Sequence, residues 1–116
     1  MPSPITTHVL DTSKGRPAAG IQVTLEVREA SSSSHNHILW KLIGEGTTDS
    51  DGRISTLLPS EYKLAPNIYR ITFETGTYQK GFYPSVSISF EVIDAQEHYH
   101  VPLLLNPYGY STYRGS

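Results

Sequence analysis

The stretch Ile21-Gln22-Val23-Thr24-Leu25-Glu26-Val27-Arg28 alternates apolar and polar side chains, one residue at a time. Because successive side chains of a strand point to opposite faces, this alternation is typical of a β-strand with one buried and one solvated face. Residues 21–28 therefore predict a half-buried strand, and the same test can be applied to the rest of the chain.

Similar short segments recur along the chain. They lie at residues 5–11, 38–43, 53–58, 68–74, 86–92 and 99–105, with a shorter one at 110–113. Turn-forming stretches at 12–17, 31–37 and 49–52 separate several of them, and residues 77–83 have room for one or two helical turns before Pro84. No repeat of 20–50 residues and no sustained helical periodicity is present. Seven or eight strands spaced in this way predict an all-β fold, a two-sheet antiparallel β-sandwich with one short helix.

Composition narrows the class of protein. The chain has 116 residues, a formal net charge of -2 and no Cys, so we expect one domain, residues 1–116, around a single core. The charge balance provides no basic stripe for nucleic acid, and no apolar run approaches the ~20 residues of a membrane span. The lack of Cys excludes disulfides, thiol nucleophiles and Cys-bound zinc. Without a recognisable signal peptide or a Ser-Lys-Leu ending, a cytoplasmic location is expected, with a peroxisomal one left open.

Strand parity predicts an outer sheet face that carries ionisable side chains together with large apolar ones. The predicted core positions of three strands are Ile5, Thr7, Val9, Ile54, Thr56, Leu58, Tyr99, Val101, Leu103 and Leu105. The opposite faces then carry His8, Arg53 and His100 together with Leu10, Leu57 and Leu104. A solvated face would not hold so many Leu residues. We therefore expect this outer face to be buried against another subunit, with a small-molecule site among its polar groups.

Several other motifs have simpler explanations than a functional site. His98 and His100 have the spacing of two zinc ligands on one strand face, but no third ligand is evident, so no metal or cofactor is predicted. The Asp49-Ser50-Asp51-Gly52 stretch is typical of a turn rather than of a calcium loop. No Gly-x-Ser-x-Gly elbow is present. The remaining cluster, two His and an Arg on a buried outer face, suits general-base chemistry on a neutral, planar substrate that forms hydrogen bonds.

Four segments resemble the transthyretin-like family. They are Thr6-Thr7-His8-Val9-Leu10-Asp11-Thr12 followed by Gly15-Arg16-Pro17-Ala18, then Phe82-Tyr83-Pro84, then residues 98–107 (HYHVPLLLNP), and finally residues 110–116 (YSTYRGS). The resemblance runs from Ile5 to the last residue. The terminal Tyr-Arg-Gly-Ser is similar to the ending of the enzyme branch, the 5-hydroxyisourate hydrolases, which transthyretins lack.

This resemblance implies an activity and an assembly. The activity is hydrolysis of the cyclic amide of 5-hydroxyisourate, a product of urate oxidation, to 2-oxo-4-hydroxy-4-carboxy-5-ureidoimidazoline, without a cofactor. The assembly is a homotetramer, a dimer of dimers with active sites in the channel between dimers. Carried over by position, the catalytic residues are His8, Arg53 and His100, and the substrate-binding residues are His8, Arg53, Tyr113, Arg114, Gly115 and Ser116.

The chemistry of these side chains suggests their roles. A neutral imidazole can take a proton from water near neutral pH, so either His8 or His100 is expected to be the base. Arg53 can stabilise negative charge on the attacked carbonyl, and the tail that ends in Ser116 can order the substrate. Two alternatives remain at this point: a carrier of thyroid-hormone-like aromatics in the same channel, and a structural sandwich module.

Overall fold

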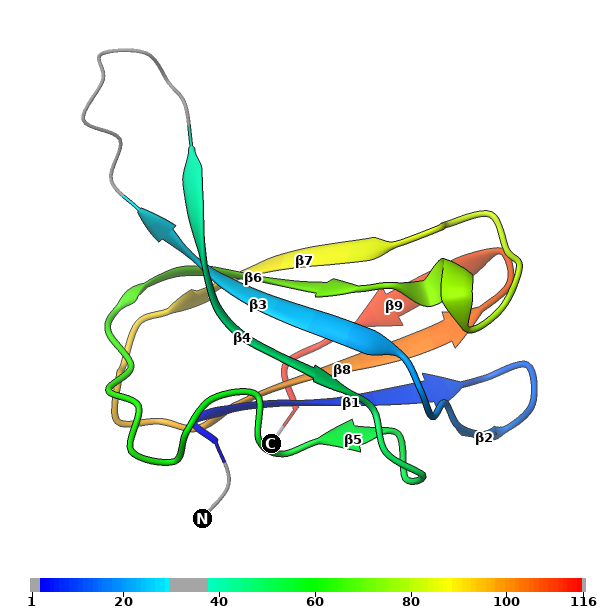
Figure 1. Ribbon diagram of the computed structural model, residues 1–116, viewed down its shortest axis with the longest axis horizontal. Helices are drawn as coiled ribbons and strands as arrows, with labels where there is room; N and C mark the ends of the chain where they lie inside the picture. The colour runs from blue at the N-terminus through cyan, green and yellow to red at the C-terminus, as the bar shows by residue number, and fades with distance from the viewer. Residues whose placement is uncertain (1–2, 30–37, 116) are drawn as a thin grey trace.

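Residues 3–29 and 38–115, which the computed structural model describes, form two β-sheets packed face to face (Figure 1). The strands are β1 (Ile5–Asp11), β2 (Arg16–Pro17), β3 (Gln22–Glu29), β4 (Leu39–Thr47), β5 (Arg53–Ile54), β6 (Asn67–Phe73), β7 (Val86–Val92), β8 (Tyr99–Asn106) and β9 (Gly109–Thr112). A 3-10 turn, η1 (Thr75–Thr77), follows β6. The predicted all-β sandwich is thus confirmed. The helical turns predicted within 77–83 are misplaced, because η1 ends at Thr77 and residues 78–83 are not helical. The predicted loop at 31–37 lies outside the described residues.

The two sheets differ in how their strands pair. One sheet has the order β4-β3-β6-β7 and is antiparallel throughout, as predicted. The other has the order β2-β1-β8-β9, with β5 also paired to β1, and here β1 and β8 run parallel. The expectation of purely antiparallel pairing is therefore wrong for this pair. A parallel pair requires a long connection, and all four strands of the β4-β3-β6-β7 sheet lie between β1 and β8 in the chain.

The alternation in the sequence corresponds to the core between the sheets. Val23 and Leu25 of β3 are buried, as are Ile5 and Val9 of β1 and alternate residues of β8 from Tyr99 to Leu105. Each sheet buries one apolar face, and burial of apolar surface stabilises the folded state by about 25 cal/mol per Å². This burial holds the layers together and sends the other face of β1 and β8 outward.

Residues 53–58 deviate from the predicted strand. β5 ends at Ile54, so parity no longer applies, and Leu57 is buried whereas Thr56 is exposed. Both assignments made from the sequence were wrong for this reason. The segment instead passes over β4, where a Cβ built on Gly44 would lie 2.2 Å from the Leu57 carbonyl oxygen. Only a glycine allows the two backbones to approach so closely.

The turn that precedes β5 has the chemistry predicted for it. Gly52 has a φ of 73°, in the left-handed region that favours glycine. The Asp49 carboxylate accepts hydrogen bonds from the backbone N–H groups of Asp51 (2.9 Å) and Arg53 (3.0 Å). These bonds, that from Arg53 foremost, hold the pKa of Asp49 below its usual value. The turn thereby fixes where β5 begins.

A buried carboxylate at the end of β1 ties the two sheets together. Asp11 accepts hydrogen bonds from the Tyr78 hydroxyl (2.6 Å), the Ser13 hydroxyl (2.7 Å) and the Ser13 and Lys14 backbone N–H groups (both 3.0 Å). Burial alone would raise the pKa of Asp11, but these donors outweigh it and hold that pKa below its usual value. Burial and the same contact raise the pKa of Tyr78 to about 12.

No helix in the described part of the chain is long and apolar enough to span a membrane.

Candidate active site

Three strands of one sheet bring the two predicted histidines and Arg53 together. β5 pairs with β1 so that Arg53 is opposite His8, and β8 pairs with β1 so that His100 is opposite Thr6. Thr6 and His8 are two residues apart on β1, so their side chains share the face turned away from the core. Opposed side chains of an antiparallel pair have Cβ atoms about 4.5–5.5 Å apart, so Arg53 lies beside His8. His100 lies on the same face at the level of Thr6, so the three predicted catalytic residues form one cluster.

A shallow hollow of about 250 Å³ lies in this face. Its lining residues are Thr6, Thr7, Arg53, Ile54, Ser55, His98 and His100. Arg53 is exposed and His100 is half-buried, so a guanidinium and an imidazole both face this space. His8 does not line it but flanks it, as the strand partner of Arg53.

Arg53 and partial burial keep the imidazole of His8 neutral. Burial is the main cause that lowers the pKa of His8, and the positive charge of Arg53 lowers it further. A hydrogen bond with the backbone of Asp51 and the carboxylates of Asp49 and Asp51 act in the opposite direction without reversing the shift. A histidine whose pKa lies below 6.5 carries a lone pair at neutral pH, which a general base requires.

His100 is affected in the same way by more neighbours. Burial again is the main cause that lowers its pKa, followed by the positive charge of Arg53 and by the nearby His8 and His98. A hydrogen bond with the backbone of Thr6 acts in the other direction. The Arg53 guanidinium thus favours neutral forms of both imidazoles and remains the permanent cation of the site.

The C-terminal segment packs directly on the His100 ring. The Gly115 N–H donates a hydrogen bond to the His100 carbonyl (2.9 Å) in an isolated antiparallel bridge. A Cβ built on Gly115 would lie 2.5 Å from Cδ2 of the ring and 3.2 Å from Cγ of Pro102. The segment can therefore cover the imidazole only because residue 115 lacks a side chain.

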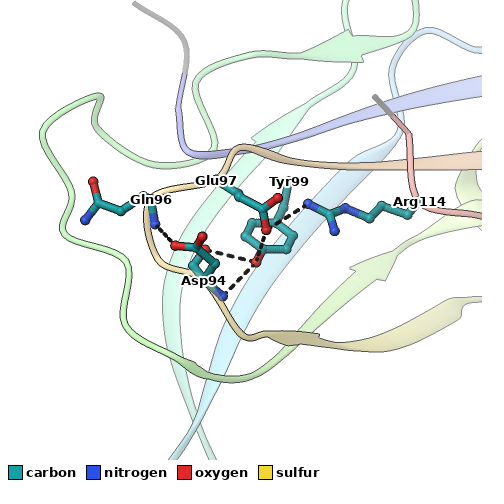
Figure 2. Close-up of polar contacts among 5 residues, drawn as sticks. All are labelled: Asp94, Gln96, Glu97, Tyr99 and Arg114. Carbon is teal, nitrogen blue, oxygen red and sulfur yellow. Dashed lines mark hydrogen bonds and ion pairs between the residues drawn. The ribbon is translucent and has the colours of Figure 1, made fainter.

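The rest of this segment is held by the loop before β8. Figure 2 shows the Arg114 guanidinium over the Tyr99 ring, 4.5 Å from its centroid, with its Nη2 atom 3.6 Å from Oε2 of Glu97. The Tyr99 hydroxyl in turn donates to the Asp94 carbonyl (3.0 Å) and accepts from the Asp94 N–H (3.2 Å). The Asp94 carboxylate closes the turn by accepting from the Gln96 N–H (2.9 Å). The Arg114 side chain thus lies against the 94–99 loop and is not among the residues lining the hollow.

Comparison with known proteins places the chain in a family. The sequence model described as "HIUase/Transthyretin family" matches residues 5–115. The chain belongs to the HIUase/Transthyretin family.

Relatives within the HIUase/Transthyretin family include named hydrolases. The chain is 43% identical over 117 residues to a 5-hydroxyisourate hydrolase of Salmonella dublin, covering 97% of this chain and 80% of that protein. It is 50% identical over 120 residues to the uric acid degradation bifunctional protein TTL of Arabidopsis thaliana. That match covers 97% of this chain but 37% of the plant protein, so the chain spans little more than a third of that relative.

Two solved structures of family members share the fold. A structure of Klebsiella pneumoniae 5-hydroxyisourate hydrolase has a TM-score of 0.77 and 32% identity, covering 97% of this chain and 98% of that one. A crystal structure of sea bream transthyretin in complex with thyroxine has a TM-score of 0.83 and 27% identity, covering 97% and 94%. The fold is therefore common to a hydrolase and to a thyroxine-bound protein, and only the site residues can distinguish the two activities.

For a member of this family, the predicted site residues are partly brought together. His8, Arg53, His100 and Gly115 lie at one place. Tyr113 and Arg114 line a second hollow of about 340 Å³, which shares His100 with the first. Ser116 lies outside the described residues.

Sequence reasoning gave no role to Thr6 or to Glu97. Thr6 shares the parity of His8 on the first predicted strand, so its position on the same face was evident. A hydroxyl in the sequence does not indicate, however, that its hydrogen-bond partner is His100, 94 residues away. No sequence pattern predicted a role for Glu97, because its contact with Arg114 depends on the path of the chain after β9.

Proposed function

We propose that this chain hydrolyses 5-hydroxyisourate, the cyclic product of urate oxidation, to a ureido-imidazoline carboxylate. The observation that supports this proposal best is the cluster of two imidazoles with lowered pKa values beside Arg53 on one sheet face. Relatives named 5-hydroxyisourate hydrolase match nearly the full length of the chain. A half-buried imidazole that stays neutral beside a cation suits base-catalysed attack of water on an amide carbonyl.

The proposed reaction needs one water molecule and no cofactor. A neutral imidazole of the site takes a proton from water while the water oxygen bonds to the cyclic amide carbonyl carbon. Arg53 stabilises the negative charge that develops on the carbonyl oxygen. The carbon–nitrogen bond of the ring then breaks, and the leaving nitrogen receives the proton from the imidazolium, so that the base is regenerated.

The segment after β9 has a supporting role in this proposal. Gly115 covers the His100 ring, and this contact limits the motion of the imidazole and the access of bulk water. The substrate contacts predicted for Tyr113, Arg114 and Ser116 stay predictions, with Arg114 anchoring the segment through Tyr99 and Glu97.

We further propose that the chain works as a homotetramer, a dimer of dimers, in the cytoplasm. Leu10 and Leu104 are strand partners on the face that carries the site, and both are only half-buried in one chain. A second pair of subunits would cover them and enclose the hollow. Sedimentation analysis should then give four times the 12.9 kDa chain mass, and Leu104→Lys should reduce the species to dimers. A monomeric wild-type protein would contradict this assembly.

The carrier alternative is less well supported. Arg53, His98 and His100 line the hollow beside Ile54 and three hydroxyl side chains, and hydrogen-bonding groups of this kind suit a polar cyclic amide better than a hydrophobic aromatic hormone.

The activity can be tested on freshly generated 5-hydroxyisourate, whose ultraviolet absorbance decays as it is consumed. The wild-type protein should accelerate the decay, and His8→Ala or His100→Ala should reduce kcat by about 10²-fold or more for whichever residue is the base. His98→Ala is an informative comparison because His98 lines the same hollow but is exposed, one residue before β8 begins. The absence of any acceleration by the wild-type protein would overturn the proposed function.

A further inference from the structure

One hydroxyl group on the site face contacts two imidazoles at once. Oγ1 of Thr6 lies 2.8 Å from Nδ1 of His100 and 3.2 Å from Nε2 of His98. Thr6 is 8% exposed, and its position opposite His100 is set by the parallel pairing of β1 with β8. These three side chains therefore form a short hydrogen-bonded chain that begins at the exposed His98 and ends at the site.

The hydroxyl can take part in this chain in only two ways. A threonine hydroxyl has one proton and two acceptor lone pairs. Among the described residues, Oγ1 of Thr6 has no hydrogen-bond partner besides these two rings, so it donates to one imidazole and accepts from the other. In the first arrangement it donates to Nδ1 of His100, and Nε2 of that ring then carries the hydrogen. In the second it accepts from Nδ1–H of His100 and donates to Nε2 of His98, which leaves Nε2 of His100 with a free lone pair.

Only the second arrangement is compatible with His100 as a base. Nδ1 is occupied by Thr6, so a proton from water can reach this ring only at Nε2. In the second arrangement that nitrogen gains a proton without loss of any existing hydrogen bond, since Nδ1–H continues to donate to Thr6.

We propose that Thr6 is a positioning residue that holds His100 in the Nδ1–H tautomer, with Nε2 as the general base and His98 as the acceptor of the Thr6 hydroxyl proton. This inference rests on the proposed hydrolase function and assigns the base, which the sequence left open between His8 and His100. His8 then serves as a neutral neighbour that, with Arg53, shapes the charge of the site. Hydrogen bonds to the far nitrogen of a working imidazole select its tautomer and its orientation in other sites as well.

The test uses three variants of the full-length protein. Thr6→Val preserves the shape of the side chain but removes the hydroxyl, and Thr6→Ser restores the hydroxyl. Thr72→Val is the matched control, because the Thr72 hydroxyl also bonds another side chain on a strand face (Ser87 Oγ, 3.0 Å) but belongs to the other sheet. We expect Thr6→Val to lower kcat by about 10- to 100-fold with little change in KM, Thr6→Ser to recover most of the loss, and Thr72→Val to match the wild type.

A second readout does not depend on activity. Nitrogen-15 chemical shifts of the neutral His100 ring distinguish Nδ1–H from Nε2–H directly in the substrate-free protein. We expect Nδ1–H in the wild type and in Thr6→Ser, and a shift toward Nε2–H in Thr6→Val. An Nε2–H ring in the wild type, or an unchanged kcat in Thr6→Val, would overturn the proposal. If the protein proved inactive on 5-hydroxyisourate, the proposed function would fail while the nitrogen-15 measurement still decided the tautomer.

Discussion

The contact between Gly115 and His100 leads to a sharp prediction about activity. In Gly115→Ala the added methyl carbon would lie 2.5 Å from Cδ2 and 3.2 Å from Cγ of the His100 ring. Carbon atoms in favourable contact are about 3.5–4.0 Å apart. The ring or the terminal segment must therefore move by about 1 Å. The ring is bonded to Thr6 through Nδ1, and the segment is bonded to the His100 carbonyl, so either movement disturbs the site.

The expected loss follows from this displacement. Misplacement of a reacting group by 1 Å can cost about 10²-fold in rate, which corresponds to about 2.7 kcal/mol of transition-state stabilisation. Stability should change by less than about 0.5 kcal/mol, because Gly115 lies beyond the last strand and outside the core. The variant should therefore be folded and nearly inactive, a combination that a general destabilisation would not produce.

The assay compares kcat/KM for decay of 5-hydroxyisourate with the unfolding midpoint of each variant. Gly109→Ala is the control, since a Cβ at Gly109 meets nothing closer than 4.0 Å and its backbone is not in the left-handed region. Gly109→Ala should retain wild-type activity. The reasoning is refuted if Gly115→Ala stays within about twofold of the wild type, or if both variants lose activity equally.

Two further predictions concern charge. In Arg53→Met the pKa values of His8 and His100 should rise, because a positive charge that lowers both is removed. Proton NMR titration of the two rings should show both midpoints at higher pH, and the acid limb of the activity profile should move the same way. Unmoved midpoints would contradict the electrostatic argument. Tyr78→Phe should lower stability at neutral pH by about 1.5–3 kcal/mol, since a hydrogen bond to the buried Asp11 carboxylate is lost. The folded-state pKa of Asp11 is depressed, so its contribution is present above pH 3.8 and disappears as the pH falls through the folded value. Urea unfolding at a series of pH values should therefore show the difference between wild type and Tyr78→Phe shrinking below about pH 4, and a difference independent of pH would count against this role of Asp11.

Period-two alternation was sufficient to locate most of the fold. The predicted segments at 5–11, 86–92 and 99–105 correspond to β1, β7 and β8 within one residue, because a strand with one buried face repeats its apolar side chains at every second position. The same rule failed for residues 53–58, where the chain bends after Ile54. β2 has only two residues, too few for any periodicity. Pairing direction was also out of reach, since the pattern within one strand does not identify its neighbour.

The same alternation rule predicted part of the candidate site from the sequence. Parity placed His8, Arg53 and His100 on the outer face, and the family resemblance singled out the terminal segment. The contact of Arg114 with Tyr99 was not foreseeable, because it depends on the path of the chain after β9. The packing of Gly115 on the imidazole was hidden for another reason: the sequence shows a missing side chain only as a flexible residue, and not as a space that another group fills.

The core and the site are two consequences of one strand register. Ile5 and Val9 on β1 and Leu103 on β8 are each 0% exposed. Keeping these side chains in the core restricts β8 to its observed register against β1. A slip of β8 by one residue would turn Leu103 to the surface and His100 into the core. Burial of each such side chain stabilises the correct register by about 1.5–3 kcal/mol. The apolar face thus fixes the positions of Thr6 and His100 on the opposite face, where the segment around Gly115 packs on the imidazole.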